Sequence, residues 1–105
     1  MSNNFLDLAE KTLNELFDSL NKYNEQFEID FIDKNITIES DDGKVFIISV
    51  HEPTKQIWLS SPISGAHHFK LSEINDTKIW ISTRDNKIDL FKIIKEEIAE
   101  IVNEN

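Results

Sequence analysis

The chain contains the stretch KQIWLSSPISG at residues 55–65, which predicts a short strand running into a Pro/Gly turn. Successive side chains of a strand point to opposite faces, so Ile57 and Leu59 share one face, while Gln56 and Trp58 share the other. If the aliphatic pair faces the core, the indole lies on the solvent side, as on a binding surface, because Trp contributes strongly to contact energies. A strand buried on both faces would instead make Trp58 a core residue, and the stretch alone favours neither interpretation.

Length and composition restrict the class of protein. The 105 residues suffice for one domain, which we expect to span residues 1–105. Hydrophobic residues make up 39% and aromatic residues 10%, as in chains that form a core. The absence of cysteine excludes disulfides and thiolate ligands. No apolar run approaches the roughly 20 residues of a transmembrane helix. No signal or transit sequence is visible either, so we expect a cytoplasmic protein of a bacterium.

The charge is strongly negative and unevenly placed. With 20 acidic and 11 basic residues, the net charge of −9 repels nucleic acids and attracts cations or basic protein surfaces. Solubility alone would also explain this charge. Most acids of the first half lie within residues 7–42, whereas residues 44–70 contain one acid, Glu52, and all three histidines. We therefore expect one strongly negative end of the domain and nearly neutral central strands.

Amphipathic helices are predicted at both ends of the chain. Residues 3–23 carry apolar side chains at helical spacing, opposite a polar face. The helix cap would come from one of three polar residues at its start: Ser2, Asn3 or Asn4. A second amphipathic helix begins near Ile88, and its charged residues, Glu97 among them, are expected on the side away from its apolar stripe.

Six strands are predicted between the helices, because apolar residues alternate with polar ones or form short β-branched runs. Their ranges are 27–31, 36–39, 45–50, 56–60, 67–71 and 78–82. Short connections require neighbouring strands to be antiparallel. The expected fold is therefore α+β, a two-layer sandwich with the N- and C-terminal helices packed on one face of an antiparallel sheet. The opposite face is left to solvent or a partner, and Trp58 is expected there.

Residues 55–65 resemble the signature of the frataxin family. The flanking pattern agrees: Glu52-Pro53 precedes the stretch, His67-His68-Phe69 follows it, and Lys78-Ile79-Trp80 comes next. The resemblance extends to the first helix with Leu8-Ala9-Glu10, to the acidic strand Glu28-Ile29-Asp30 and to the helix after Asp89-Leu90. It covers nearly the whole chain and, without a transit peptide, is similar to the bacterial, CyaY-like members.

The resemblance implies an iron-binding protein of iron–sulfur cluster assembly. Its role would be that of an iron-dependent regulator, or of an iron-delivery factor, that binds the cysteine desulfurase–scaffold complex. It implies a monomer, with an iron-induced oligomer as a further state. The alternative is a weak ferroxidase or iron-storage protein. Di-iron oxidation commonly uses a Glu-x-x-His pair, which this sequence lacks, so a binding protein is favoured over an enzyme and no catalytic residue is assigned.

The resemblance also assigns two sets of site residues. Weak, exchangeable Fe2+/Fe3+ binding falls on an acidic ridge of six carboxylates: Glu10, Glu15, Asp18, Glu25, Glu28 and Asp30. Partner contacts fall on Gln56, Trp58 and His68, with His51 nearby.

Oxygen ligands without cysteine suit Fe2+, Fe3+, Mn2+ or Ca2+, and carboxylates this scattered predict weak, unselective binding. Lys22 adds a positive charge inside the acidic ridge, and a merely solvated helix face explains any single carboxylate equally well. A histidine metal site is disfavoured, because His67 and His68 are adjacent in a strand and point to opposite faces.

Overall fold

The computed structural model describes residues 5–104 of the chain, and the predicted caps Ser2, Asn3 and Asn4 lie outside the described residues. Helix α1 spans Phe5–Leu20 and continues as a 3-10 turn over Asn21–Tyr23, and helix α2 spans Leu90–Glu104. The strands are β1 (Phe27–Ile32), β2 (Asn35–Ser40), β3 (Val45–His51), β4 (Gln56–Ser61), β5 (Gly65–Ile74) and β6 (Thr77–Ser82).

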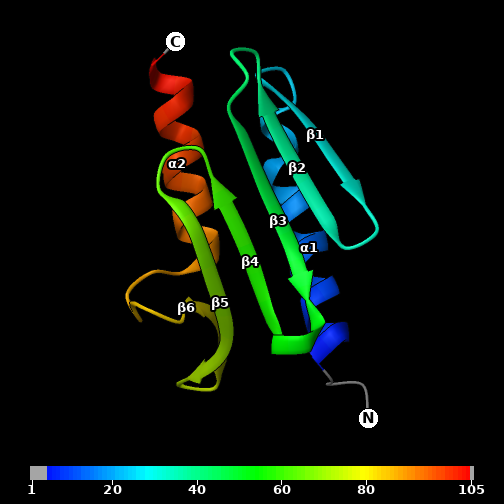
Figure 1. Ribbon diagram of the computed structural model, residues 1–105, viewed down its shortest axis with the longest axis vertical. Helices are drawn as coiled ribbons and strands as arrows, with labels where there is room; N and C mark the ends of the chain where they lie inside the picture. Colours follow the sequence, from blue (N-terminus) through cyan, green and yellow to red (C-terminus); the bar gives the residue numbers. More distant parts are fainter. Residues whose placement is uncertain (1–4, 105) are drawn as a thin grey trace.

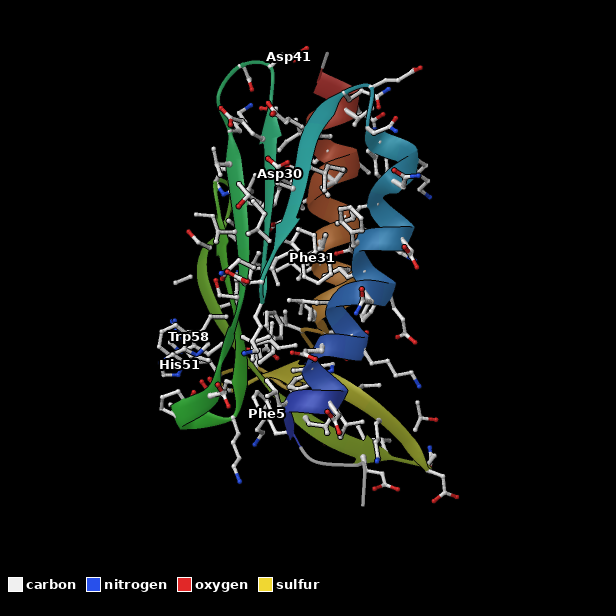
Figure 2. The ribbon with its side chains drawn as sticks, turned by 90° about the vertical axis from the view of Figure 1, so that its right-hand side faces the viewer. Phe5, Asp30, Phe31, Asp41, His51 and Trp58 are labelled. Carbon is white, nitrogen blue, oxygen red and sulfur yellow. The ribbon has the colours of Figure 1, made fainter. Side chains whose placement is uncertain are left out.

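The six strands form one antiparallel sheet whose spatial order follows the sequence, from β1 at one edge to β6 at the other (Figure 1). Both helices lie on the same side of this sheet, whereas His51 and Trp58 point away from it on the other side (Figure 2). The predicted two-layer α+β sandwich with about six strands is therefore confirmed. Its helix-free side is called the open face below.

The core lies between the helices and the inward side chains of the strands. Alternation along the strands places Phe46, Ile48, Ile57 and Leu59 on the inner face, where they are buried. The apolar stripe of α1, with Leu13 at its centre, packs against them. Each such side chain contributes about 1.5–3 kcal/mol when it is fully buried, which fixes the register of every strand.

The structure extends the predicted β5–β6 hairpin. The sequence predicted strands over 67–71 and 78–82, but β5 continues to Ile74 and pairs there with Thr77. The two residues between them, Asn75 and Asp76, have φ values of 53° and 64°. A two-residue hairpin loop of this kind needs positive φ at both positions, which Asn and Asp tolerate better than most residues.

Helix α2 begins later than predicted, and it buries one acid that the sequence placed outside. Asp89 caps the helix, because its Oδ1 accepts the backbone N–H of Phe91 at 3.1 Å. The prediction that Glu97 faces solvent was wrong: it is 7% exposed. The Ser61 hydroxyl at the end of β4 donates to Glu97 Oε1 at 2.6 Å, so a buried hydrogen bond replaces solvation.

Candidate interaction surface and acidic ridge

Trp58 lies on the open face between two histidines. Register places Trp58 opposite His68 on β5, and the end of β3 brings His51 to its other side. The rings of His51 and Trp58 are 3.8 Å apart between centroids and 13° from parallel. Those of Trp58 and His68 are 4.4 Å apart and 17° from parallel. We call these three rings the His–Trp–His stack.

The His–Trp–His stack is held by side-chain hydrogen bonds. The indole N–H of Trp58 donates to Oε1 of Gln56 at 2.8 Å. Nδ1 of His51 lies 2.7 Å from Oγ1 of Thr54, in the short 3-10 turn that joins β3 to β4. That turn ends at Lys55, whose φ of 55° is left-handed and returns the chain directly into β4. The turn between β3 and β4 therefore positions both His51 and Gln56.

The predicted placement of Trp58 on the open face is confirmed, but its exposure is lower than that placement alone suggests. The side chain is half-buried, because an imidazole covers each face of the indole. A partner therefore meets the edges of three stacked rings rather than a free indole face. This pre-built arrangement lowers the entropy that the side chains lose on binding.

His67 and His68 diverge, as predicted. His67 lies opposite Leu59 on the inner side of the sheet, and its Nε2 lies 2.8 Å from the Ser64 hydroxyl. His68 belongs to the His–Trp–His stack on the open face. Within the part of the chain that the structure describes, no three His, Asp or Glu side chains are grouped closely enough to hold a metal ion.

The six carboxylates of the acidic ridge are all exposed, and the structure places them in separate groups. Glu10 lines a hollow of about 330 Å3 with Asn14, Phe31 and Asp33, beside the β1–β2 turn. Glu15 lines a different hollow of about 300 Å3, whose wall also includes Asp89. Glu10 and Glu15 therefore lie on opposite flanks of α1.

The other members of the acidic ridge lie farther along the chain. Asp18 is exposed on α1, and Glu25 lies in the segment that joins the 3-10 turn to β1. Glu28 and Asp30 alternate with the inward residues of β1 and so lie on the open face. Glu28 pairs directly with Glu39 of β2, so the two carboxylates repel each other unless a cation or a basic partner is near.

One acid beside the ridge was not identified from the sequence. Asp33 shares its hollow with Glu10 and has a φ of 56°. The short connection between the strands predicted at 27–31 and 36–39 implied a turn but gave no sign that packing would bring this turn against α1. Lys22, in the 3-10 turn after α1, lies with its Nζ 5.3 Å from the centroid of the Tyr23 ring, so its charge is partly engaged in a cation–π contact.

Comparison with known proteins agrees with this geometry. Residues 1–104 match the frataxin-like domain. The chain is 29% identical over 105 residues to the mitochondrial frataxin of Arabidopsis thaliana, covering 95% of this chain but only 54% of that protein. It is 27% identical over 95 residues to the iron–sulfur cluster assembly protein CyaY of Neisseria meningitidis, covering 90% of this chain and 83% of that protein.

Solved structures share the fold. The frataxin of Psychromonas ingrahamii superposes with a TM-score of 0.76 at 20% identity, over 91% of this chain and 86% of that one. A trimeric frataxin of Saccharomyces cerevisiae complexed with ferrous iron gives 0.71 at 31% identity, over 88% of this chain and 82% of that one.

Fold and surface together define a small α+β protein with two helices on one side of its sheet and an uncovered face on the other. The match over residues 1–104 gives the family: the chain belongs to the frataxin-like family. No helix within residues 5–104 is long and apolar enough to cross a membrane.

Proposed function

We propose that this protein acts in iron–sulfur cluster assembly in the cytoplasm, as an iron-binding regulator or iron-delivery factor that contacts a cysteine desulfurase–scaffold complex. The observation that carries the proposal is the pre-built His–Trp–His stack on a sheet face that neither helix covers. The name of the Neisseria relative as an iron–sulfur cluster assembly protein supports the same pathway. The acting species is a monomer, which iron can bring into an oligomer.

Iron is the cargo in this proposal, and it binds on the acidic ridge. Exposed carboxylates supply the oxygen ligands that suit Fe2+ and Fe3+, yet they are separated, so each ion keeps most of its water and exchanges readily. The ferrous complex of the yeast relative supports an iron-binding role. A ferroxidase centre needs clustered carboxylates, and the described residues offer no group of three, so binding is favoured over oxidation.

The partner surface comprises Gln56, Trp58, His68 and His51. All four are half-buried and lie on the open face, where the sheet holds them in one orientation. Aromatic side chains that are rigid before binding typically contribute the largest share of contact energy. The acidic ridge, at the β1 edge and on α1, would meet a basic area of the same complex.

A cluster-assembly assay tests this function. Purified protein is added to a cysteine desulfurase and its scaffold, with and without Fe2+, and cluster formation is followed by absorbance. We expect the protein to change the rate of cluster formation, and we expect the size of that change to depend on Fe2+. Equal rates with and without the protein, at both iron levels, would contradict the proposal.

A further inference from the structure

A polar hollow of about 480 Å3 lies on the open face, where β5 and β6 meet the loop after β6. Its lining includes Lys70 and Ser72 of β5 and Thr83, Arg84 and Asp85 of the loop. Lys70 and Ser72 have the same strand parity as His68, so they share the open face with Trp58. We call this feature the Lys70–Arg84 hollow.

The Lys70–Arg84 hollow adjoins the His–Trp–His stack. Lys70 lies directly opposite Gln56, the residue that accepts the indole N–H of Trp58. The backbone N–H of Thr83 donates to the carbonyl of His68 at 2.8 Å, which holds the loop against β5. Arg84 Nη2 reaches toward the carbonyl of Ala66 at 3.4 Å. The stack and the hollow therefore form one continuous surface across β4, β5 and the loop.

The charge of this surface is opposite to that of the molecule. Lys70 and Arg84 are exposed, and neither forms an ion pair with a carboxylate of residues 5–103. Asp85 is the one acid in the lining, and its Oδ1 accepts the backbone N–H of Lys87 at 3.0 Å. Two cations and two imidazoles therefore lie together near β5, although the net charge of the whole chain is −9.

We propose that the Lys70–Arg84 hollow and the His–Trp–His stack together dock an acidic segment of the protein partner; this rests on the proposed function and names the chemistry of the segment. Carboxylates of the segment pair with Lys70 and with the guanidinium of Arg84, whose planar fork matches a carboxylate. Apolar parts of the segment contact the ring edges. A single small anion would leave the stack uncovered, whereas a peptide spans both.

The acidic ridge fixes the direction of docking. Glu28, Asp30 and Glu39 lie on the open face at the β1 edge, across the sheet from the hollow. They repel an acidic segment from that edge, while the cations at β5 and the loop after β6 attract it. Charge therefore favours binding of the segment near β5 and the loop after β6, and disfavours its binding at the β1 edge.

A titration with a hexaglutamate peptide, followed by NMR of the 15N-labelled protein, tests the inference. We expect shifts of the backbone amides of Lys70 and Arg84 and of the Trp58 indole N–H. The double variant Lys70→Glu/Arg84→Glu should weaken binding about tenfold or more, because it removes two attractive charges and adds two repulsive ones. Asp85→Asn should strengthen binding, and thermal melts verify that each variant is folded.

Control experiments distinguish binding at this site from an effect of net charge. The double variant Lys92→Glu/Lys95→Glu, at two exposed lysines of α2, changes the net charge by the same amount and should leave hexaglutamate affinity nearly unchanged, and hexaglutamine should not bind. Equal weakening by Lys92→Glu/Lys95→Glu would overturn the inference as an effect of net charge. Equal shifts from free glutamate at the same carboxylate concentration would overturn it in favour of a small-anion site. The same shifts on raising protein concentration without peptide would assign the surface to a second copy.

The cluster-assembly assay distinguishes this inference from the proposed function. If Lys70→Glu/Arg84→Glu acts like the unmodified protein while Trp58→Ala loses its effect, the acidic-segment inference fails and the proposed function stands. If the unmodified protein itself has no effect on cluster formation at either iron level, the proposed function fails, whatever the peptide titration shows.

Discussion

At the scale of single residues, Trp58 shows how a side chain on a solvent-facing strand position becomes rigid. Its two neighbours in the stack come from different strands, and each covers one face of the indole. Offset or parallel ring pairs contribute about 0.5–1.5 kcal/mol beyond area burial. The hydrogen bond from the indole N–H to Gln56 restricts the remaining rotation of the Trp58 side chain. The result is an aromatic edge with one defined orientation.

Replacing Trp58 by alanine should weaken binding to the desulfurase–scaffold complex by about 2 kcal/mol or more, as expected for a central aromatic contact. The free energy of unfolding should also fall, by about 1–3 kcal/mol for the two lost ring contacts, but the chain should stay folded because the core lies on the other side of the sheet. Titration calorimetry measures the first effect and urea denaturation the second. Ser60→Ala, at an exposed position on the same face of β4, is the matched control and should bind normally. Undiminished affinity of Trp58→Ala would remove the stack from the interface.

Asp42, in the turn between β2 and β3, makes the stability of the protein depend on pH. The Ser40 hydroxyl donates to its Oδ1 and lowers the pKa of this carboxyl, and Lys44, whose Nζ is 3.3 Å from Oδ2, lowers it further. A depressed pKa adds stability that is fully present above the unfolded value of about 3.9 and lost as pH falls through the folded value.

The free energy of unfolding of Asp42→Asn should therefore lie below that of the unmodified protein at pH 6, and the gap should close as the pH falls below about 4. Urea denaturation at a series of pH values measures it. Ser40→Ala removes the same hydrogen bond and also the acceptor of the Lys44 backbone N–H, so its deficit in unfolding free energy should narrow at low pH but not close. If the difference in unfolding free energy between Asp42→Asn and the unmodified protein stayed constant down to pH 2, the hydrogen bond would not act through protonation of Asp42.

At the scale of elements, one buried hydrogen bond joins α1 to the edge strand β6. The indole N–H of Trp80 donates to Oγ1 of Thr12 at 2.8 Å, and that hydroxyl donates to the carbonyl of Leu8 at 2.8 Å. Trp80 is 4% exposed, and its hydrogen bond to Thr12 is buried. Helix and sheet are thus tied at a specific rotation of α1.

Thr12→Val should lower the free energy of unfolding by about 1–3 kcal/mol, because it leaves a buried donor without an acceptor. Asn14→Ala is the control: its side chain bonds the carbonyl of Glu10 at an exposed position, so its loss should cost little. Chemical denaturation compares the two. Equal effects would show that Trp80 finds another acceptor.

The elements themselves could be predicted from periodicity, because burial on one face forces the alternation that identifies β1 to β4. The length of β5 could not, since residues 72–74 do not continue the inward apolar alternation of this strand, with Glu73 at an inward position, and yet they pair with β6. The burial of Glu97 escaped prediction because it depends on one distant hydroxyl, Ser61.

The site was predictable to a similar extent. Trp58 was placed on the correct face, but its stacking on His51 and His68 depends on side-chain rotamers and on which residues pair across strands. The Lys70–Arg84 hollow was not foreseen either, because its two cations come from different elements and meet only in the folded chain.

At the scale of the whole molecule, charge is divided between two ends of the sheet. Acids gather at β1 and on α1, whereas Lys70, Arg84 and two histidines lie around β5. We expect affinity for the desulfurase–scaffold complex to fall as NaCl rises from 50 to 500 mM, because exposed charges are screened over about 10 Å at 0.1 M. Titrations at several salt concentrations measure this. Affinity independent of salt would contradict an electrostatic contact.

Iron binding tests whether the separated carboxylates act together. Asp18→Asn combined with Glu28→Gln removes one charge from α1 and one from β1. If each charge contributes about 0.5–1 kcal/mol, the pair contributes about 1–2 kcal/mol, so iron should bind about 5- to 30-fold more weakly. Glu96→Gln with Glu100→Gln, at exposed positions of α2, makes the net charge less negative by the same two units and is the matched control. Anaerobic Fe2+ titration by calorimetry compares the two pairs. If the control pair weakens binding as much, iron responds to overall charge; if neither pair changes the titration, the ions bind elsewhere, and Glu10 with Asp33 in their common hollow become the next residues to replace.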